Sequence, residues 1–129
     1  MASWDGVLKE ISECERKDDI DFIRRQYIKK LADYTGRNTI IYYSSWLTNN
    51  IIGTDINDND MNGFMNAVNG LDCSKGLDLI LHTPGGYPTA AEAIVKYLRS
   101  KFRNDIRMIV PQLAMSAGTM VACAGKEII

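Results

Sequence analysis

Short apolar runs recur along the chain and are separated by longer segments with helical periodicity. The runs at residues 39–46, 77–82 and 106–110 are rich in β-branched, leucine and aromatic residues. Their length and composition predict three strands, because a strand enclosed on both faces of a sheet reads as a nearly continuous apolar run. The apolar residues after Glu127 predict the start of a fourth strand at residues 127–129.

A helix is predicted over about residues 19–34, ahead of the first strand. Asp18 or Asp19 stands where an N-cap is expected, and Gly36 stands where a helix ends. We interpret this helix as a solvated cover on one side of the domain, with an oligomer contact as the alternative. Its apolar stripe consists of Ile20, Ile23, Tyr27, Leu31 and Tyr34.

A second helix is predicted after the Asn-, Asp- and Gly-rich loop at residues 48–60, with Asp58 or Asp60 as its cap. The loop has a partial likeness to a calcium-binding loop. However, Asp60 replaces the required glycine and Asn66 replaces the required glutamate, so we expect no metal site there. The apolar face of the helix consists of Phe64, Met65, Val68 and Leu71.

Two further helices are expected after the second and third strands. Thr89 and Glu92 form a capping-box pattern that opens a helix running to about Phe102. The small residues at 114–124 predict a tightly packed helix, with Cys123 as a buried core residue. The inward-facing positions of the first of these two helices are Ala93, Ile94, Tyr97 and Leu98.

Strands that alternate with helices at this spacing predict an α/β fold with a parallel sheet and right-handed βαβ crossovers. We expect an N-terminal helical segment at residues 1–38 and the sheet domain at residues 39–129. The content of 46% apolar residues excludes a disordered chain. The formal net charge of -1 argues against a protein that holds nucleic acid through its phosphates.

The sequence lacks the features of a membrane or secreted protein, and this suggests its cellular compartment. No apolar run reaches the roughly 18 residues of a membrane span, and the first ten residues lack the pattern of a secretory signal. The cysteines Cys14, Cys73 and Cys123 form no CxxC pair and leave one unpaired in any disulfide scheme. A reduced, cytoplasmic protein without a metal or cofactor is the simplest interpretation.

Candidate chemistry lies at two points where a predicted strand leads into a helix, since ligand sites of parallel α/β proteins form there. In the turn that begins at Thr83, Gly85 and Gly86 expose N–H groups that can bind an oxyanion, a phosphate or a carboxylate; a plain tight turn is the alternative. Ser116 follows the third strand, with its hydroxyl beside the N–H of Ala117; an N-cap serine is the alternative. Together the junctions offer a nucleophile and two N–H donors, which are the parts of an acyl-transfer site.

Two motifs at these junctions resemble those of the serine peptidases of the Clp/crotonase superfamily. They are Asp78-Leu-Ile-Leu-His-Thr-Pro-Gly-Gly86 and, after a helix and a strand, Ala114-Met-Ser-Ala-Gly-Thr119. The most similar group is that of the serine dehydrogenase proteinases, relatives of ClpP and of the signal peptide peptidase SppA. The resemblance covers roughly residues 15–129 and implies a Clp/crotonase-like fold.

By position, the resemblance implies a role for four residues of the two motifs. Ser116 would be the nucleophile, Gly86 and Ala117 the donors of a backbone oxyanion hole, and Gly85 the residue that shapes the turn. The resemblance also implies hydrolysis of peptide bonds through an acyl-enzyme, in a homo-oligomer that acts on peptides or unfolded proteins. An association with membranes is implied only by the family likeness.

A nucleophilic serine needs a general base, and the motifs do not supply one. By resemblance, a histidine or lysine base would fall beyond Ile129, so we expect residues 1–129 to be the first part of a catalytic domain and inactive alone. His82 is interpreted as a residue that orients the turn, and Lys126 as a solvent-facing cation. Two alternatives stay open: a non-catalytic peptide-binding or scaffold subunit, and a crotonase-like acyl-CoA enzyme.

Overall fold

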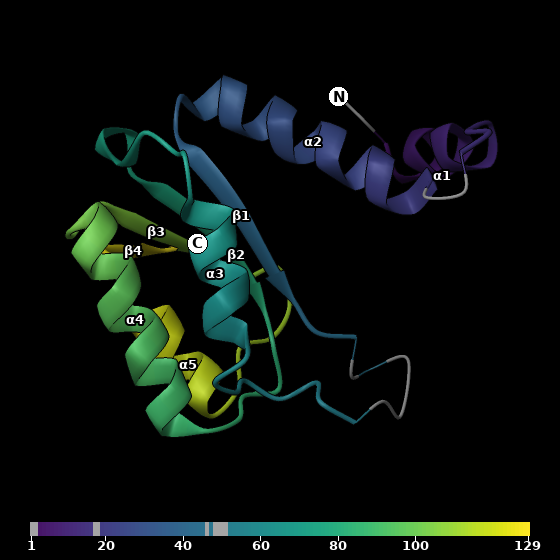
Figure 1. The fold of residues 1–129 in the computed structure, drawn as a ribbon. Coiled ribbons are helices and arrows are strands. Elements are labelled where there is room, and N and C mark those ends of the chain that lie inside the picture. Colours follow the sequence, from purple (N-terminus) through teal and green to yellow (C-terminus); the bar gives the residue numbers. More distant parts are fainter. Residues whose placement is uncertain (1–2, 17–18, 46, 48–51) are drawn as a thin grey trace. The chain divides into compact units, whose positions relative to one another are not determined.

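The computed structural model describes residues 3–16, 19–45, 47 and 52–129 (Figure 1). The chain divides into two compact units, Met1–Thr35 and Gly36–Ile129. The first unit contains two helices and the second contains the sheet. The second unit carries the residues of the candidate site.

The first unit consists of helices α1, Trp4–Ser12, and α2, Asp19–Thr35. The predicted helix at residues 19–34 is therefore confirmed, whereas α1 was not predicted. Its N-cap is Ser3, whose hydroxyl accepts a hydrogen bond from the N–H of Gly6. The predicted apolar stripe of α2 is unevenly covered: Ile23 is buried, but Tyr34 is exposed.

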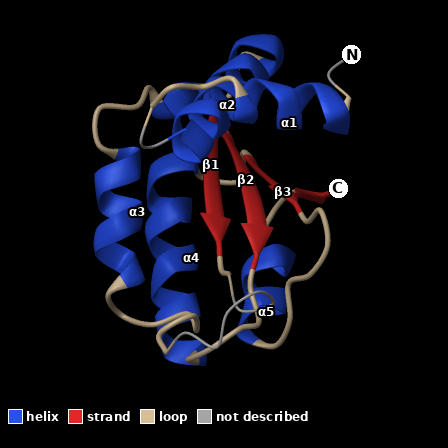
Figure 2. Cartoon of the chain, turned by 90° about the vertical axis from the view of Figure 1, so that its right-hand side faces the viewer, coloured by secondary structure: helices blue, strands red, loops and turns tan. Residues whose placement is uncertain are grey.

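The second unit is built on a sheet of four parallel strands in the order β1-β2-β3-β4, which confirms the predicted parallel α/β fold (Figures 1 and 2). The first strand ends at Tyr43, earlier than predicted, and Trp46 lies outside the described residues. The strands are β1 Asn38–Tyr43, β2 Leu77–His82, β3 Ile106–Ile109 and β4 Glu127–Ile128.

One face of this sheet is packed against three helices, α3 Asp60–Val68, α4 Pro88–Phe102 and α5 Ala117–Cys123. A short 3₁₀ turn, η1 at Cys73–Lys75, precedes β2. Alternate residues of a strand share a face, so the buried leucines of β2 all point toward these helices. The buried cluster includes Leu77, Leu79 and Leu81 of β2, Phe64 and Val68 of α3, Ile94 and Leu98 of α4, and Val121 of α5.

The predicted capping box of α4 is wrong. Its N-cap is Tyr87, which makes no side-chain capping bond, and Pro88 is the first helical residue. Proline favours that position because its fixed φ suits a helix and it has no N–H to satisfy. Thr89 therefore lies inside the helix, and Glu92 pairs instead with Lys96, at 2.7 Å between carboxylate and amine.

The predicted cap of α3 is also wrong, because neither Asp58 nor Asp60 occupies the N-cap position. That position is held by Asn59, without a side-chain bond. The Oδ2 atom of Asp60 accepts hydrogen bonds from the N–H of Asn57, at 2.9 Å, and from the hydroxyl of Tyr42, at 2.8 Å. Burial and this hydrogen bond both raise the pKa of Tyr42 above its ordinary value, so the phenol remains a neutral donor.

Three predicted core positions are exposed instead. Ala93 of α4 and Met65 of α3 face solvent, and so does Cys123 of α5. Helix α5 begins at Ala117 rather than at residue 114, which sets the phase of its buried face. Cys123 follows the buried Val121 by two positions, about 200° around the helix, and therefore points away from the core.

Sequence reasoning did not single out the buried carboxylate of Asp78, which lies between two arginines near the start of β2. Its Oδ1 atom lies 2.6 Å from Nε of Arg37, and its Oδ2 atom lies 2.6 Å from Nη2 of Arg107. Arg37 also pairs with Asp105, at 2.8 Å. Burial acts to raise the pKa of Asp78, but the hydrogen bonds from Arg107 and Arg37 outweigh it and hold this pKa below its usual range.

The first prediction concerns stability and Asp78. We expect Asp78→Asn to lower the free energy of unfolding by roughly 2–4 kcal/mol, because it removes the ion-pair partner of the partly buried Arg107 and leaves Arg37 paired only with the half-exposed Asp105. In the native protein the lowered pKa makes the carboxylate stabilising above the unfolded value of about 3.9. That stabilisation is lost as the pH falls through the lower folded pKa. Urea unfolding between pH 2 and pH 7 measures both effects.

The matched control is Asp21→Asn, which removes an exposed carboxylate paired with Arg24 on α2. An exposed pair of this kind contributes little, so the control should unfold like the native protein. Equal stability of the Asp78→Asn and Asp21→Asn proteins at pH 7 would contradict the assigned role of the buried carboxylate.

Candidate active site

The two predicted junctions lie next to each other at the carboxyl edge of the sheet. The pairing of β2 with β3 continues beyond both strands through an isolated parallel bridge between Thr83 and Ala114. Thr83 donates its N–H to the carbonyl oxygen of Leu113, and its own carbonyl accepts from the N–H of Met115, both at 3.1 Å. Figure 2 shows β1 and β2 running toward the end of the unit where α5 lies.

Ser116 stands at the start of α5 in a strained conformation. Its φ of 52° and ψ of -123° lie in a region that residues with side chains rarely adopt. Such backbone strain recurs at active sites and at the sharp turn that exposes a catalytic serine. Ser116 occupies the N-cap position without forming a side-chain capping bond, and its exposed hydroxyl has no hydrogen-bond partner within the described residues.

Gly85 brings the turn after β2 against the serine. Its φ of 101° favours glycine, and a Cβ atom placed on it would lie 2.7 Å from Cβ of Ser116. The same atom would lie 2.6 Å from the carbonyl oxygen of Met115. Only a residue without a side chain permits this approach, so the two junctions are held at van der Waals distance.

The N–H groups of Gly86 and Ala117 are among the backbone donors at this edge that have no acceptor within the described residues. The carbonyl of Gly85 accepts a hydrogen bond from the N–H of Ile56, at 2.8 Å. A trans peptide bond directs its N–H opposite to its carbonyl, so the N–H of Gly86 points away from Ile56. Two unpaired donors beside an exposed hydroxyl form an arrangement that can bind a developing oxyanion.

Ile56 is a contributor that sequence reasoning missed. It is buried, and its backbone would lie 2.3 Å from a Cβ atom on Gly86. A single apolar residue inside a polar loop was the only sequence signal for it. The contact shows that Gly86, like Gly85, is a position where a side chain does not fit.

His82, the chain's single histidine, is buried and bonded at both ring nitrogens. Nδ1 lies 3.1 Å from the carbonyl oxygen of Ser44, and Nε2 lies 3.2 Å from the side-chain amide of Gln112. The ring also stacks on Tyr43, with 5.1 Å between ring centroids. This arrangement agrees with a residue that orients the strand ends. It leaves neither nitrogen free to accept a proton from Ser116.

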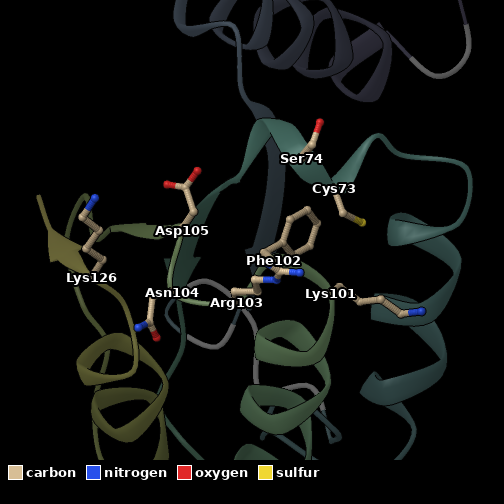
Figure 3. A pocket seen from close by; sticks show the side chains of 8 residues that line it. All are labelled: Cys73, Ser74, Lys101, Phe102, Arg103, Asn104, Asp105 and Lys126. Atoms are coloured by element: carbon tan, nitrogen blue, oxygen red, sulfur yellow. The ribbon is translucent and has the colours of Figure 1, made fainter.

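A pocket of about 660 Å³ lies at the opposite, amino edge of the sheet (Figure 3). Its residues come from the end of α4 and from the segments before β2, β3 and β4, and none belongs to the two junctions. Lys126, predicted to face solvent, is exposed there. Figure 3 shows Lys101 and Lys126 at opposite ends of the pocket, so their charges do not converge. The lining consists of Cys73, Ser74, Lys101, Phe102, Arg103, Asn104, Asp105 and Lys126.

The geometry described above is that of a parallel α/β protein with a serine and two unpaired N–H groups at one sheet edge. A family model described as ClpP-like SDH-type serine proteinase matches residues 12–129, which is most of the chain. The protein therefore belongs to the ClpP-like family of SDH-type serine proteinases, as the two motifs indicated. None of the helices in the described part of the chain is long and apolar enough to cross a bilayer.

Two similar proteins come from Methanocaldococcus jannaschii. The uncharacterized protein MJ0137 is 41% identical over 70 residues, which are 54% of this chain and 24% of that protein. The uncharacterized protein MJ1495 is 43% identical over 53 residues, which are 41% of this chain and 18% of that protein. The matched segments thus span about a quarter or less of the length of either relative.

The second prediction concerns Gly85. We expect Gly85→Ala to lower the free energy of unfolding by about 2 kcal/mol or more, because the new Cβ overlaps backbone atoms and the positive φ strains alanine. Thermal and urea unfolding measure the change. The control is Gly63→Ala in α3, where a Cβ meets no atom within 4 Å. This control should gain up to about 1 kcal/mol from helix propensity. A Gly85→Ala protein as stable as the native one would contradict the close approach to Ser116.

Proposed function

We propose that this protein is a serine peptidase that cleaves peptide bonds through an acyl-enzyme on Ser116. The observation that carries the proposal is the unbonded hydroxyl of Ser116, a residue in a strained conformation that lies against Gly85, whose next neighbour Gly86 has an N–H without an acceptor, as has Ala117. The family match supports the reaction class, since the family is described as one of serine proteinases.

In this mechanism the Oγ atom of Ser116 attacks the carbonyl carbon of the scissile peptide bond while a base removes its proton. The carbonyl oxygen becomes an oxyanion and accepts hydrogen bonds from the N–H groups of Gly86 and Ala117. The tetrahedral intermediate expels the amine, which takes the proton from the protonated base. Water then attacks the resulting ester, and its hydrolysis releases the acid and restores the serine.

Neither His82 nor Lys126 is placed to act as this base. Both ring nitrogens of His82 are bonded to other groups, and Lys126 lies at the opposite edge of the sheet. We propose that a residue outside residues 1–129 supplies the base, and that residues 1–129 alone are therefore inactive. By family resemblance, the assembly is a homo-oligomer and the substrates are peptides or unfolded proteins.

The third prediction tests the nucleophile in the protein as the cell produces it. A fluorophosphonate probe should label Ser116, located by peptide mass spectrometry, because the probe reacts with activated serines. Ser116→Ala should abolish labelling and reduce peptide hydrolysis by at least about 10³-fold. The control is Ser100→Ala, which alters an exposed hydroxyl on α4 that donates to the carbonyl of Tyr97.

The outcomes separate the candidate functions. Unchanged hydrolysis in the Ser116→Ala protein would exclude this serine as the nucleophile. Peptide binding without labelling or turnover in the native protein would instead favour a non-catalytic binding subunit. Thioester turnover that survives Ser116→Ala would favour an acyl-CoA enzyme, in which the two N–H groups polarise a thioester carbonyl.

A further inference from the structure

Thr83 is the first residue of the turn after β2, and the proposed mechanism does not use it. It follows the last residue of β2 and is fully buried. Its backbone forms the last paired position between the turn after β2 and the loop that leads to Ser116, through Leu113 and Met115. The position of the serine relative to the turn therefore depends on this residue.

The side chain of Thr83 contacts both junctions. Its Oγ1 atom accepts a hydrogen bond from the N–H of Gly85, at 3.1 Å. Its Cγ2 methyl occupies the space beside Gly118, where an added Cβ would lie only 2.5 Å from it. The hydroxyl thus holds the turn after β2, and the methyl packs against the first turn of α5.

The hydroxyl bond restrains the residue that orients the N–H of Gly86. Gly85 has no side chain, so its two dihedral angles are unusually free unless its flanking peptide groups are anchored. Oγ1 of Thr83 anchors the peptide group before its Cα, and the N–H of Ile56 anchors the one after it. With both anchors in place, the direction of the N–H of Gly86 is set.

We propose that Thr83 is a positioning residue for this site, whose hydroxyl aligns the N–H of Gly86 with the oxyanion of the transition state. The inference rests on the proposed function. Thr83 is buried beneath the turn and makes its contribution through Gly85. A misaligned donor to the transition state slows the chemical step. Loss of the Thr83 hydroxyl should therefore lower kcat rather than change KM.

The fourth prediction uses two substitutions of Thr83 in the protein as the cell produces it. Thr83→Val keeps the shape but removes the hydroxyl, and should lower kcat for peptide hydrolysis by about 10- to 100-fold with KM changed less than about threefold. Thr83→Ser keeps the hydroxyl and should restore kcat to within about fivefold of the native value. These two results together support the proposal.

A matched control removes a threonine hydroxyl elsewhere in the sheet. The Oγ1 atom of Thr39, on β1, is buried and has no hydrogen-bond partner among the described residues. Thr39→Val makes the same chemical change as Thr83→Val without breaking a bond, and should leave kcat unchanged. A kcat lowered equally in both variants would overturn the proposal, because the loss would then not depend on the bond to Gly85.

Amide hydrogen exchange gives a readout that needs no turnover. The N–H of Gly85 should exchange at least about tenfold faster in Thr83→Val than in the native protein or in Thr83→Ser, because its acceptor is gone. Unchanged exchange in Thr83→Val overturns the proposal. So does a Thr83→Ser protein as slow in turnover as Thr83→Val, since the loss of turnover would then not follow the loss of the hydroxyl.

A parallel assay of Ser116→Ala separates the two hypotheses. If Ser116→Ala keeps full activity, the proposed function fails, and the role of Thr83 in it fails with it. If Ser116→Ala is inactive and Thr83→Val keeps the native kcat, only the role of Thr83 is overturned. The two failures therefore give different patterns of activity.

Discussion

The candidate site depends on main-chain pairing that continues past the ends of β2 and β3. Parallel strands end at a common edge, but their ends diverge unless the loops beyond them are also bonded. Here the backbone of Thr83 pairs with Leu113 and Met115, and the absence of a side chain on Gly85 lets the turn reach Ser116. Ser116 and the N–H groups of Gly86 and Ala117, from segments thirty residues apart, thereby share one edge of the sheet.

The two edges of the sheet have different physical characters. At the amino edge, the buried Asp78 and its arginine partners hold the starts of the strands together, and with Asp105 their charges are balanced within the protein. At the carboxyl edge, the N–H groups of Gly86 and Ala117 and the hydroxyl of Ser116 have no partners among the described residues. Unsatisfied polar groups at a surface are available to a ligand, whereas a saturated cluster contributes stability. The proposed chemistry therefore lies at the carboxyl edge.

Local sequence patterns predicted the kinds of elements better than their boundaries. The helix after β3 was predicted from its small residues, but it begins at Ala117, because the preceding residues pair with Thr83. The capping box of α4 failed because Pro88 starts the helix before Thr89. Helix α1 was missed, although Ser3 provides an N-cap signal. In each case a neighbouring bond or a single residue outweighed the average propensity of the segment.

By itself, the sequence determined the order of strands and helices, the parallel α/β class and the two motifs around Gly86 and Ser116, because periodicity and turn chemistry are local properties. The tertiary structure alone decided which distant groups meet. It placed Asp78 between two arginines, set Ile56 against Gly86, and bonded both nitrogens of His82 to other residues. Such contacts join residues far apart in the chain, so their partners follow from the packing of the sheet and not from spacing along the sequence.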